Sequence, residues 1–255
     1  MKKVILMVCA IMGATHLVEA QHPEVTLDTQ RKNTIKIDLT SYYLYRNAIA
    51  ISYERITKPN QSFAVTAGYQ EFPRTSSLGD SIGVKDDRDR NGFKIAGEYR
   101  FYLKKENKHL APRGLYIGPY MAFHAFNNER VIEVEVDNNG TKEVEEAILD
   151  SKLTIFNVGF QLGYQFMFNN RWTIDLVLIG PAISNYRYNL KMGGNYTFDK
   201  EDIQNEIVLA LIEKFPLLGD VIDDKEVSGT GNLNAWAYGY RYQLLIGYHF
   251  GRKKK

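Results

Sequence analysis

A nearly unbroken two-residue alternation over residues 154–168 constrains the fold more than any other feature of the chain. Bulky apolar and aromatic residues occupy every second position, and smaller or polar residues mostly occupy the positions between them. Successive side chains of a β-strand point to opposite faces, so this segment and the similar residues 236–250 are predicted as strands with one apolar face. Both exceed the usual strand of about five or six residues, whereas about ten residues tilted at roughly 45° cross a bilayer. The pattern therefore predicts the wall of a membrane-spanning β-barrel.

Alternation between turn signals predicts eight strands along the chain, and an even number is expected for bacterial barrels. The predicted strands cover residues 34–44, 48–56, 62–72, 92–103, 114–126, 151–168, 171–188 and 232–250. Apart from a short first connection, short and long connections alternate, and the long ones cover residues 73–91, 127–150 and 189–231. Short periplasmic turns and long outer loops are the usual asymmetry, so both termini are expected in the periplasm.

The first twenty residues have the features of a secretory signal peptide. Lys2 and Lys3 precede an apolar stretch at residues 4–14, and the stretch ends near a small-residue cleavage pattern at residues 18–20. We expect residues 1–20 to be removed and residues 21–255 to form a single barrel domain. Cys9 belongs to the expected signal, so no cysteine chemistry is expected in the mature chain.

Large apolar residues gather on one parity of the predicted strands, and charged residues gather on the other. A soluble lipocalin-like barrel would need the aromatic bulk inside, but an eight-stranded interior holds little more than its own side chains. The apolar parity is therefore predicted to face lipid, with the soluble barrel kept as an alternative. The aromatic residues expected on the lipid-facing side include Phe156, Phe160, Tyr164, Trp236, Tyr240 and Tyr248.

The charged parity is predicted to form an ion-paired and hydrogen-bonded plug inside the barrel, because buried charges are tolerated only when they are paired. The expected members of this interior polar network are Glu54, Lys94, Glu98, Arg100, Asp175 and Arg241. Because the interior is expected to be filled, a structural role is favoured over a narrow channel.

Residues 47–55, residues 64–69 and the closing residues 246–250 resemble a domain-of-unknown-function family of small outer-membrane β-barrels. The architecture of that family is similar to OmpA- and OmpW-type eight-stranded barrels. The resemblance implies an antiparallel up-and-down transmembrane barrel in the outer membrane of a Gram-negative bacterium. The closing aromatic strand also resembles the signal read by the barrel assembly machinery, although the chain continues beyond Phe250.

A calcium-loop pattern is formally present around Asp87, Asp89 and Asn91, with Gly92 following and Glu98 six residues after the glycine. Residues 93–103 alternate as a strand, which at about 3.3 Å per residue would place Glu98 roughly 20 Å from Gly92. That separation prevents a compact cage of oxygen ligands. We therefore expect a solvated loop and no metal, with Asp87, Asp89 and Asn91 as the residues to examine.

One histidine is a candidate general base. Some eight-stranded outer-membrane barrels are lipid-modifying enzymes, and His124 lies near the outer end of its predicted strand. Ser184 and Ser151 lie near strand ends, but the sequence does not fix their distance from His124. A single histidine on a polar face is more often an interior hydrogen-bonding residue, so no catalytic site is predicted.

The net charge of +2 gives no indication of a nucleic-acid partner, but acidic residues are unevenly distributed. Residues 127–150 carry eight acidic and two basic residues, and residues 199–226 carry nine and three. The latter include a predicted amphipathic helix over residues 199–216. We expect a structural or surface-interaction role through these acidic outer loops, without a cofactor. The expected partners are outer-membrane lipids, the barrel assembly machinery and an unidentified extracellular molecule; the alternatives are a lipid-modifying enzyme, a channel and a soluble barrel.

Overall fold

The computed structural model describes residues 31–71, 82–105, 107, 109–138, 141–194 and 232–251. The predicted signal peptide and the predicted helix at residues 199–216 lie outside these ranges. In the described part of the chain, no helix is long and apolar enough to cross a membrane.

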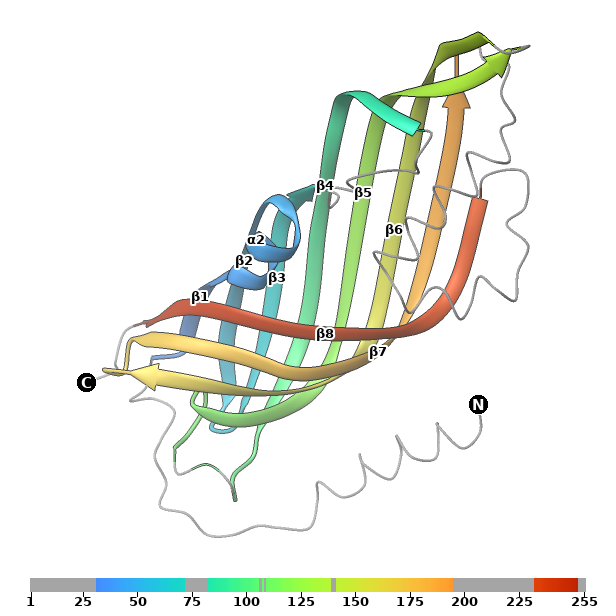
Figure 1. Cartoon of the computed structure of the whole chain (residues 1–255). Helices are drawn as coiled ribbons and strands as arrows, with labels where there is room; N and C mark the ends of the chain where they lie inside the picture. The colour runs from blue at the N-terminus through green and yellow to red at the C-terminus, as the bar shows by residue number, and fades with distance from the viewer. Residues whose placement is uncertain are drawn as a thin grey trace, which may run out of the picture.

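Eight antiparallel strands form a closed barrel in which each strand pairs with its neighbours in the sequence (Figure 1). The ring closes because β1 pairs with β8, and Asn33 lies opposite Phe250. This arrangement confirms the predicted all-β, eight-stranded, up-and-down architecture. The strands are β1 (Asn33–Asp38), β2 (Arg46–Lys58), β3 (Gln61–Glu71), β4 (Ile82–Tyr102), β5 (Gly114–Asn138), β6 (Thr141–Phe168), β7 (Trp172–Gly193) and β8 (Asn232–Phe250).

The predicted first strand, residues 34–44, is wrong in its second half, because Leu39–Leu44 forms a helix, α2. The side chain of Asp38 accepts hydrogen bonds from the backbone N–H of Ser41 at 3.1 Å and from its hydroxyl at 2.7 Å. This is the N-cap arrangement that satisfies the free N–H groups at the start of a helix. α2 contacts both β2 and β8 and so continues the wall where β1 stops (Figure 1).

Two of the predicted loops are also wrong where the structure describes them, which for the first excludes residues 73–81. β4 already begins at Ile82, within the predicted loop 73–91. β5 and β6 pair without interruption through the predicted loop 127–150, as far as Asn138 opposite Thr141. The acidic residues indicated a solvated loop, but over residues 131–136 they are interleaved with valine and isoleucine, which favour strands.

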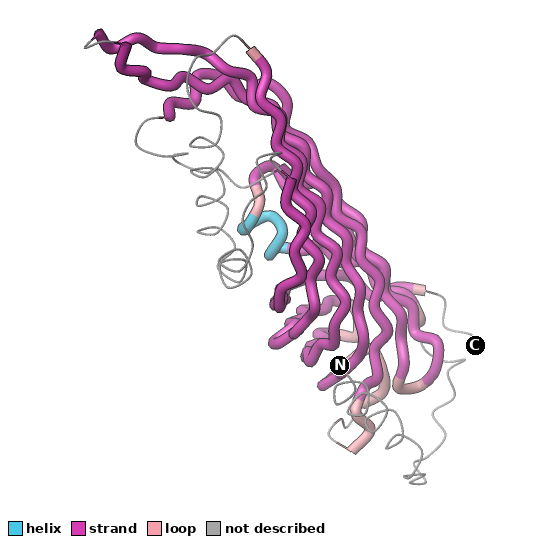
Figure 2. The backbone as a smooth tube through the Cα atoms, turned by 90° about the vertical axis from the view of Figure 1, so that its right-hand side faces the viewer, coloured by secondary structure: helices cyan, strands magenta, loops and turns pink. Residues whose placement is uncertain are grey.

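The strands differ strongly in length, which makes one end of the barrel much taller on one side. β1 and β3 have 6 and 11 residues, whereas β4, β5, β6 and β7 have 21, 25, 28 and 22. The long strands continue beyond the barrel body as an open sheet (Figures 1 and 2). We call this part of β4–β7 the sheet extension, and we call the opposite end, with the short β2–β3 and β6–β7 connections, the turn end.

Close packing of neighbouring strands leaves no room for a side chain at Gly118 of β5. A Cβ atom there would lie 1.7 Å from the backbone oxygen of Tyr99 in β4, whereas a Cβ atom at Gly97 would meet nothing within 4 Å. Backbone atoms cannot move aside cheaply, so Gly118 is required by the approach of the two strands.

We predict that Gly118→Ala lowers the free energy of unfolding by about 1–3 kcal/mol through overpacking. Gly97→Ala is the matched control and should change it by less than about 0.5 kcal/mol. Urea unfolding followed by tryptophan fluorescence measures both. Equal stabilities for the two variants would contradict the described approach of β4 and β5.

Candidate functional site

Buried charges form the centre of the barrel interior, in the half nearer the turn end. Nζ of Lys36 lies 2.6 Å from Oε2 of Glu54 and 2.5 Å from Oδ2 of Asp175. Nη1 of Arg100 lies 2.6 Å from the same Asp175 oxygen, and its guanidinium also pairs with Glu98. These side chains are almost fully buried, so each charge depends on its partners for stabilisation.

Neutral side chains complete the hydrogen bonding of this ion cluster. The hydroxyl of Tyr116 donates to Oδ1 of Asp175 at 2.7 Å, and the hydroxyl of Tyr102 donates to Oε1 of Glu54 at 2.8 Å. Oε1 of Gln165 accepts from Nζ of Lys36 at 2.8 Å. Because β1, β2, β4, β5, β6 and β7 each contribute a side chain, the cluster fills the cross-section of the barrel.

The structure brings five of the six residues of the predicted polar network into one ion cluster. Arg241 joins it through Glu98, at 2.7 Å between Nη2 and Oε2. Lys94 lies apart and pairs with Asp38 at 2.7 Å. Sequence reasoning did not assign Lys36 to the network, although its inward parity on β1 was the available signal.

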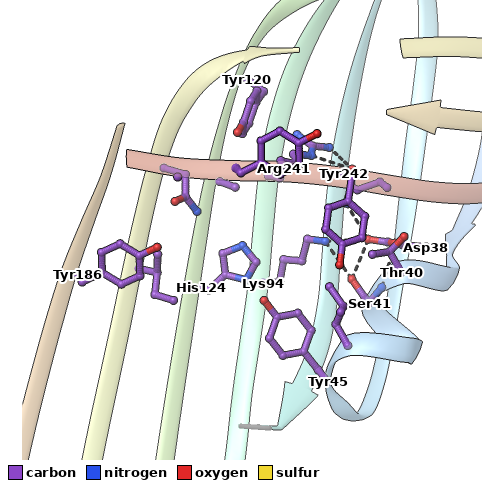
Figure 3. Close-up of a pocket in the computed structure, with 18 residues that line it drawn as sticks. Asp38, Thr40, Ser41, Tyr45, Lys94, Tyr120, His124, Tyr186, Arg241 and Tyr242 are labelled. Atoms are coloured by element: carbon purple, nitrogen blue, oxygen red, sulfur yellow. Dashed lines mark hydrogen bonds and ion pairs between the residues drawn. The ribbon is translucent and has the colours of Figure 1, made fainter. Parts of the chain in front are cut away.

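A cavity of about 180 Å³ lies beside this cluster, next to α2 (Figure 3). Asp38 and Ser41 line one side, and Arg241 and Tyr242 of β8 lie beside them. Nζ of Lys94 donates to Ser41 Oγ at 3.0 Å, so one lysine neutralises the capping carboxylate and holds α2 against the barrel interior.

His124, the candidate general base, lines the same cavity. Its Nδ1 lies 3.0 Å from Nε2 of Gln70, and its ring packs 6.2 Å from that of Tyr45. Neither of the two serines near strand ends is bonded to it: Ser184 donates to Asn157 at 2.6 Å, and Ser151 donates to a backbone carbonyl. The described contacts thus give His124 an interior hydrogen-bonding position.

The residues of the formal calcium pattern lie on a strand and not in a loop. Asp87 and Asp89 pair with β5, and the side chain of Asn91 accepts from that of Asn127 at 2.9 Å. No group of three or more potential metal ligands occurs among the described residues.

The predicted lipid-facing aromatic residues lie on the outer surface of the barrel. Phe156, Phe160, Trp236 and Tyr240 are exposed, whereas Tyr164 and Tyr248 are half-buried. Partial burial of Tyr248 comes from neighbouring side chains, since its ring lies 5.3 Å from that of Trp172.

Sequence comparison assigns the chain to a family. The family model described as "Protein of unknown function (DUF3575)" matches residues 6–208. The chain belongs to the DUF3575 family. This confirms the resemblance to a family of unknown function, and no curated protein matches the sequence.

Two solved structures resemble this DUF3575 protein in fold over most of its length. Acinetobacter baumannii CarO2 shares 9% identity with a TM-score of 0.35, covering 86% of this chain and 98% of its own. A major outer membrane protein from Thermus thermophilus shares 8% identity with a TM-score of 0.35, covering 86% and 99%. At these scores neither likeness bears on the function of this chain.

The ion cluster predicts a large effect of removing its central lysine. Lys36→Met leaves Glu54 and Asp175 facing each other with only Arg100 between them, and should lower the free energy of unfolding by about 3–5 kcal/mol. The double variant Lys36→Met/Glu54→Gln should recover part of the loss. Lys58→Met, at an exposed lysine, is the control. Additive losses in the double-mutant cycle would show that Lys36 and Glu54 do not interact.

Proposed function

We propose that this DUF3575 protein is an integral outer-membrane barrel with a closed interior, which presents an acidic surface for interaction outside the membrane. The observation that carries the proposal is the inverted distribution of side chains. Charged residues are buried within a closed barrel, and large apolar residues are exposed around it. The exposed set includes Ile51, Phe93, Ile95, Met121, Val158, Phe160, Trp172, Ile183 and Ile246.

Lipid accounts for both parts of this distribution. A soluble monomer rarely exposes an apolar belt of this extent. In a bilayer, exposed apolar side chains meet hydrocarbon, and a closed ladder satisfies the backbone polar groups of the strands. The filled cross-section supports a structural role over a conducting channel, because Lys36, Glu54, Arg100 and Asp175 occupy the space that a pore would need.

The proposed orientation follows from the ends of the barrel. Asn33, the first residue of β1, pairs with Phe250, the last residue of β8, at the turn end. Short turns are typical of the periplasmic side of bacterial barrels, so we place this end in the periplasm and the sheet extension outside the cell. Outer-membrane lipids and the barrel assembly machinery are then the first partners of the protein.

The hairpin of β5 and β6 is the proposed interaction surface. Residues 127–150 carry eight acidic and two basic residues, and pairing of residues 127–138 with residues 141–152 holds both strands in a sheet. Lys85 of β4 bridges two of the acids, with Glu133 at 3.3 Å, and its hydrogen bonds to Glu146 and Glu133 raise the pKa of its ammonium group. A negative surface that is already ordered loses little conformational entropy on binding, which favours a cationic partner.

The membrane assignment predicts an asymmetric response at Phe160, an exposed residue of β6. Phe160→Arg should lower the free energy of unfolding of the lipid-refolded protein by about 2–4 kcal/mol, because the charge would enter hydrocarbon. Phe160→Leu should cost little. The fraction of protein that migrates as a folded barrel on an unheated gel is measured at increasing urea concentrations. It gives the free energy of unfolding of both variants. An arginine without effect would place this face in water.

The surface role predicts salt-dependent binding of a cationic probe. The triple variant Glu133→Gln/Glu145→Gln/Glu146→Gln should weaken binding of a decalysine peptide about tenfold, at ~0.5 kcal/mol for each lost charge contact. Added salt should weaken binding to the parent protein in the same direction. Glu71→Gln, outside the hairpin, is the control. Equal binding by parent and triple variant, measured by calorimetry in nanodiscs, would remove the hairpin from the proposal.

A further inference from the structure

The barrel wall is interrupted where α2 replaces the outer part of β1. β1 pairs with β8 only as far as Asp38 opposite Leu245. Beyond that point, the N–H of Leu244 donates to Oγ1 of Thr40 at 2.7 Å. Among the described residues, no strand pairs with residues 232–244 of β8 on the side facing α2. We call the junction between α2 and residues 239–244 of β8 the seam.

The cavity beside the ion cluster passes through this seam. Its lining includes the consecutive residues 239–243 of β8, among them the inward Arg241 and Gln243 and the outward Tyr240 and Tyr242. On β4, β5 and β6 the lining residues share the inward parity, whereas on β8 residues of both parities line the cavity. The cavity therefore reaches the edge of β8 that no described strand covers.

The seam lies in the outer half of the proposed membrane span. β1 has six residues, whereas a tilted strand needs about ten to cross the hydrocarbon. α2 therefore occupies the level of the outer leaflet. Its side chains Tyr42 and Tyr43 are exposed, as is typical of aromatic residues near the membrane–water interface.

Free hydrogen-bond donors face this space. Nη1 of Arg241 is buried and has no hydrogen-bond partner within the described part of the chain, while the rest of its guanidinium bonds Glu98 and Gln243. Tyr45 and Tyr242 are two further lining residues, and their hydroxyls can donate a hydrogen bond. The ring of Tyr120 packs against this guanidinium, with 4.6 Å between the ring centroid and Cζ of Arg241.

The carboxylate of Asp38, the acidic group in the cavity lining, is already occupied. Asp38 accepts from Ser41, from Lys94 at 2.7 Å and from Gln243 at 2.8 Å. A ligand that suits the remaining donors supplies oxygen acceptors, and an oxyanion supplies them with charge. At about 180 Å³ the cavity is smaller than the roughly 300–1,000 Å³ of sites for drug-sized ligands, so it suits a head group.

We propose that the seam admits a single-chain amphiphile with an oxyanion head from the outer leaflet. Arg241, with the hydroxyls of Tyr45 and Tyr242, binds the head in the cavity, and the tail remains in the seam against lipid. The route rests on the proposed membrane position of the barrel. The head-group chemistry is shared by carboxylates and phosphate monoesters, and the two are separated by experiment.

Dodecanoate, dodecyl phosphate and dodecanol form a matched series for the test. The full-length protein is refolded in phosphatidylcholine vesicles, and each amphiphile displaces a dansyl-labelled undecanoic acid. We expect at least one of the two anions to compete about tenfold better than dodecanol. One charge-assisted hydrogen bond accounts for a difference of about this size. Preference for dodecanoate identifies a fatty-acid head, and preference for dodecyl phosphate identifies a phosphate head.

Variants separate binding from folding. Arg241→Gln should remove the preference for anions. Because Arg241 also pairs with Glu98, two variants without a charge change accompany it: Tyr242→Phe, which deletes one donor, and Ala122→Phe, which fills the cavity. Both should weaken probe binding, whereas Tyr238→Phe, an exposed tyrosine of the same strand, should not.

The outcomes distinguish this proposal from the membrane assignment. A protein that inserts into vesicles but binds dodecanol as well as both anions overturns the head-group site alone. Unchanged probe binding by Ala122→Phe and Tyr242→Phe would also overturn the head-group site alone. Failure of the parent protein to insert overturns the membrane position and the lateral route together.

Discussion

The pairing of Lys36 and Arg100 with Glu54 and Asp175 is the interaction on which the rest of the barrel depends. An eight-stranded ring is too narrow to hold much water, so inward charges must satisfy one another. Each of these four side chains comes from a different strand, and their mutual distances of 2.5 to 3.7 Å leave little freedom in how the strands are set. The same pairs that neutralise the interior therefore also help to fix the register of the wall.

The helix α2 depends on that interior as well. Its capping residue Asp38 is neutralised by Lys94 and bonded to Gln243, which in turn accepts from Arg241. A continuous set of polar contacts thus runs from the cap of the helix to the ion cluster. These contacts hold the short helix where the wall is interrupted, and Oγ1 of Thr40 accepts from the backbone N–H of Leu244, which a longer β1 would have bonded.

Much of the fold was predictable from the sequence, because parity carries the information about which face of a strand is buried. The alternation over residues 154–168 predicted β6 at the turn end, and inward parity singled out Glu54, Arg100 and Asp175. The inward parity of Lys36 indicated an interior position, but parity does not say which inward side chains meet across the barrel, so Lys36 was not assigned to the network. α2 was missed because Ile35, Ile37 and Leu39 continue the strand pattern into the helix, and only the cap of Asp38 on Ser41 ends it. The continuation of β5 and β6 through residues 127–138 and 141–150 was missed because the acidic residues indicated a loop more strongly than the interleaved valines of residues 131–136 indicated a strand.

The unequal strand lengths have a mechanical consequence. A ring of strands is only as strong as its weakest junctions, and here the two shortest ladders are those that β1 makes with β2 and with β8. Force applied around the circumference would separate β1 from one of these neighbours before it parted β5 from β6, whose ladder runs the full length of β5. The barrel thus has a built-in line of parting, and it runs directly into α2.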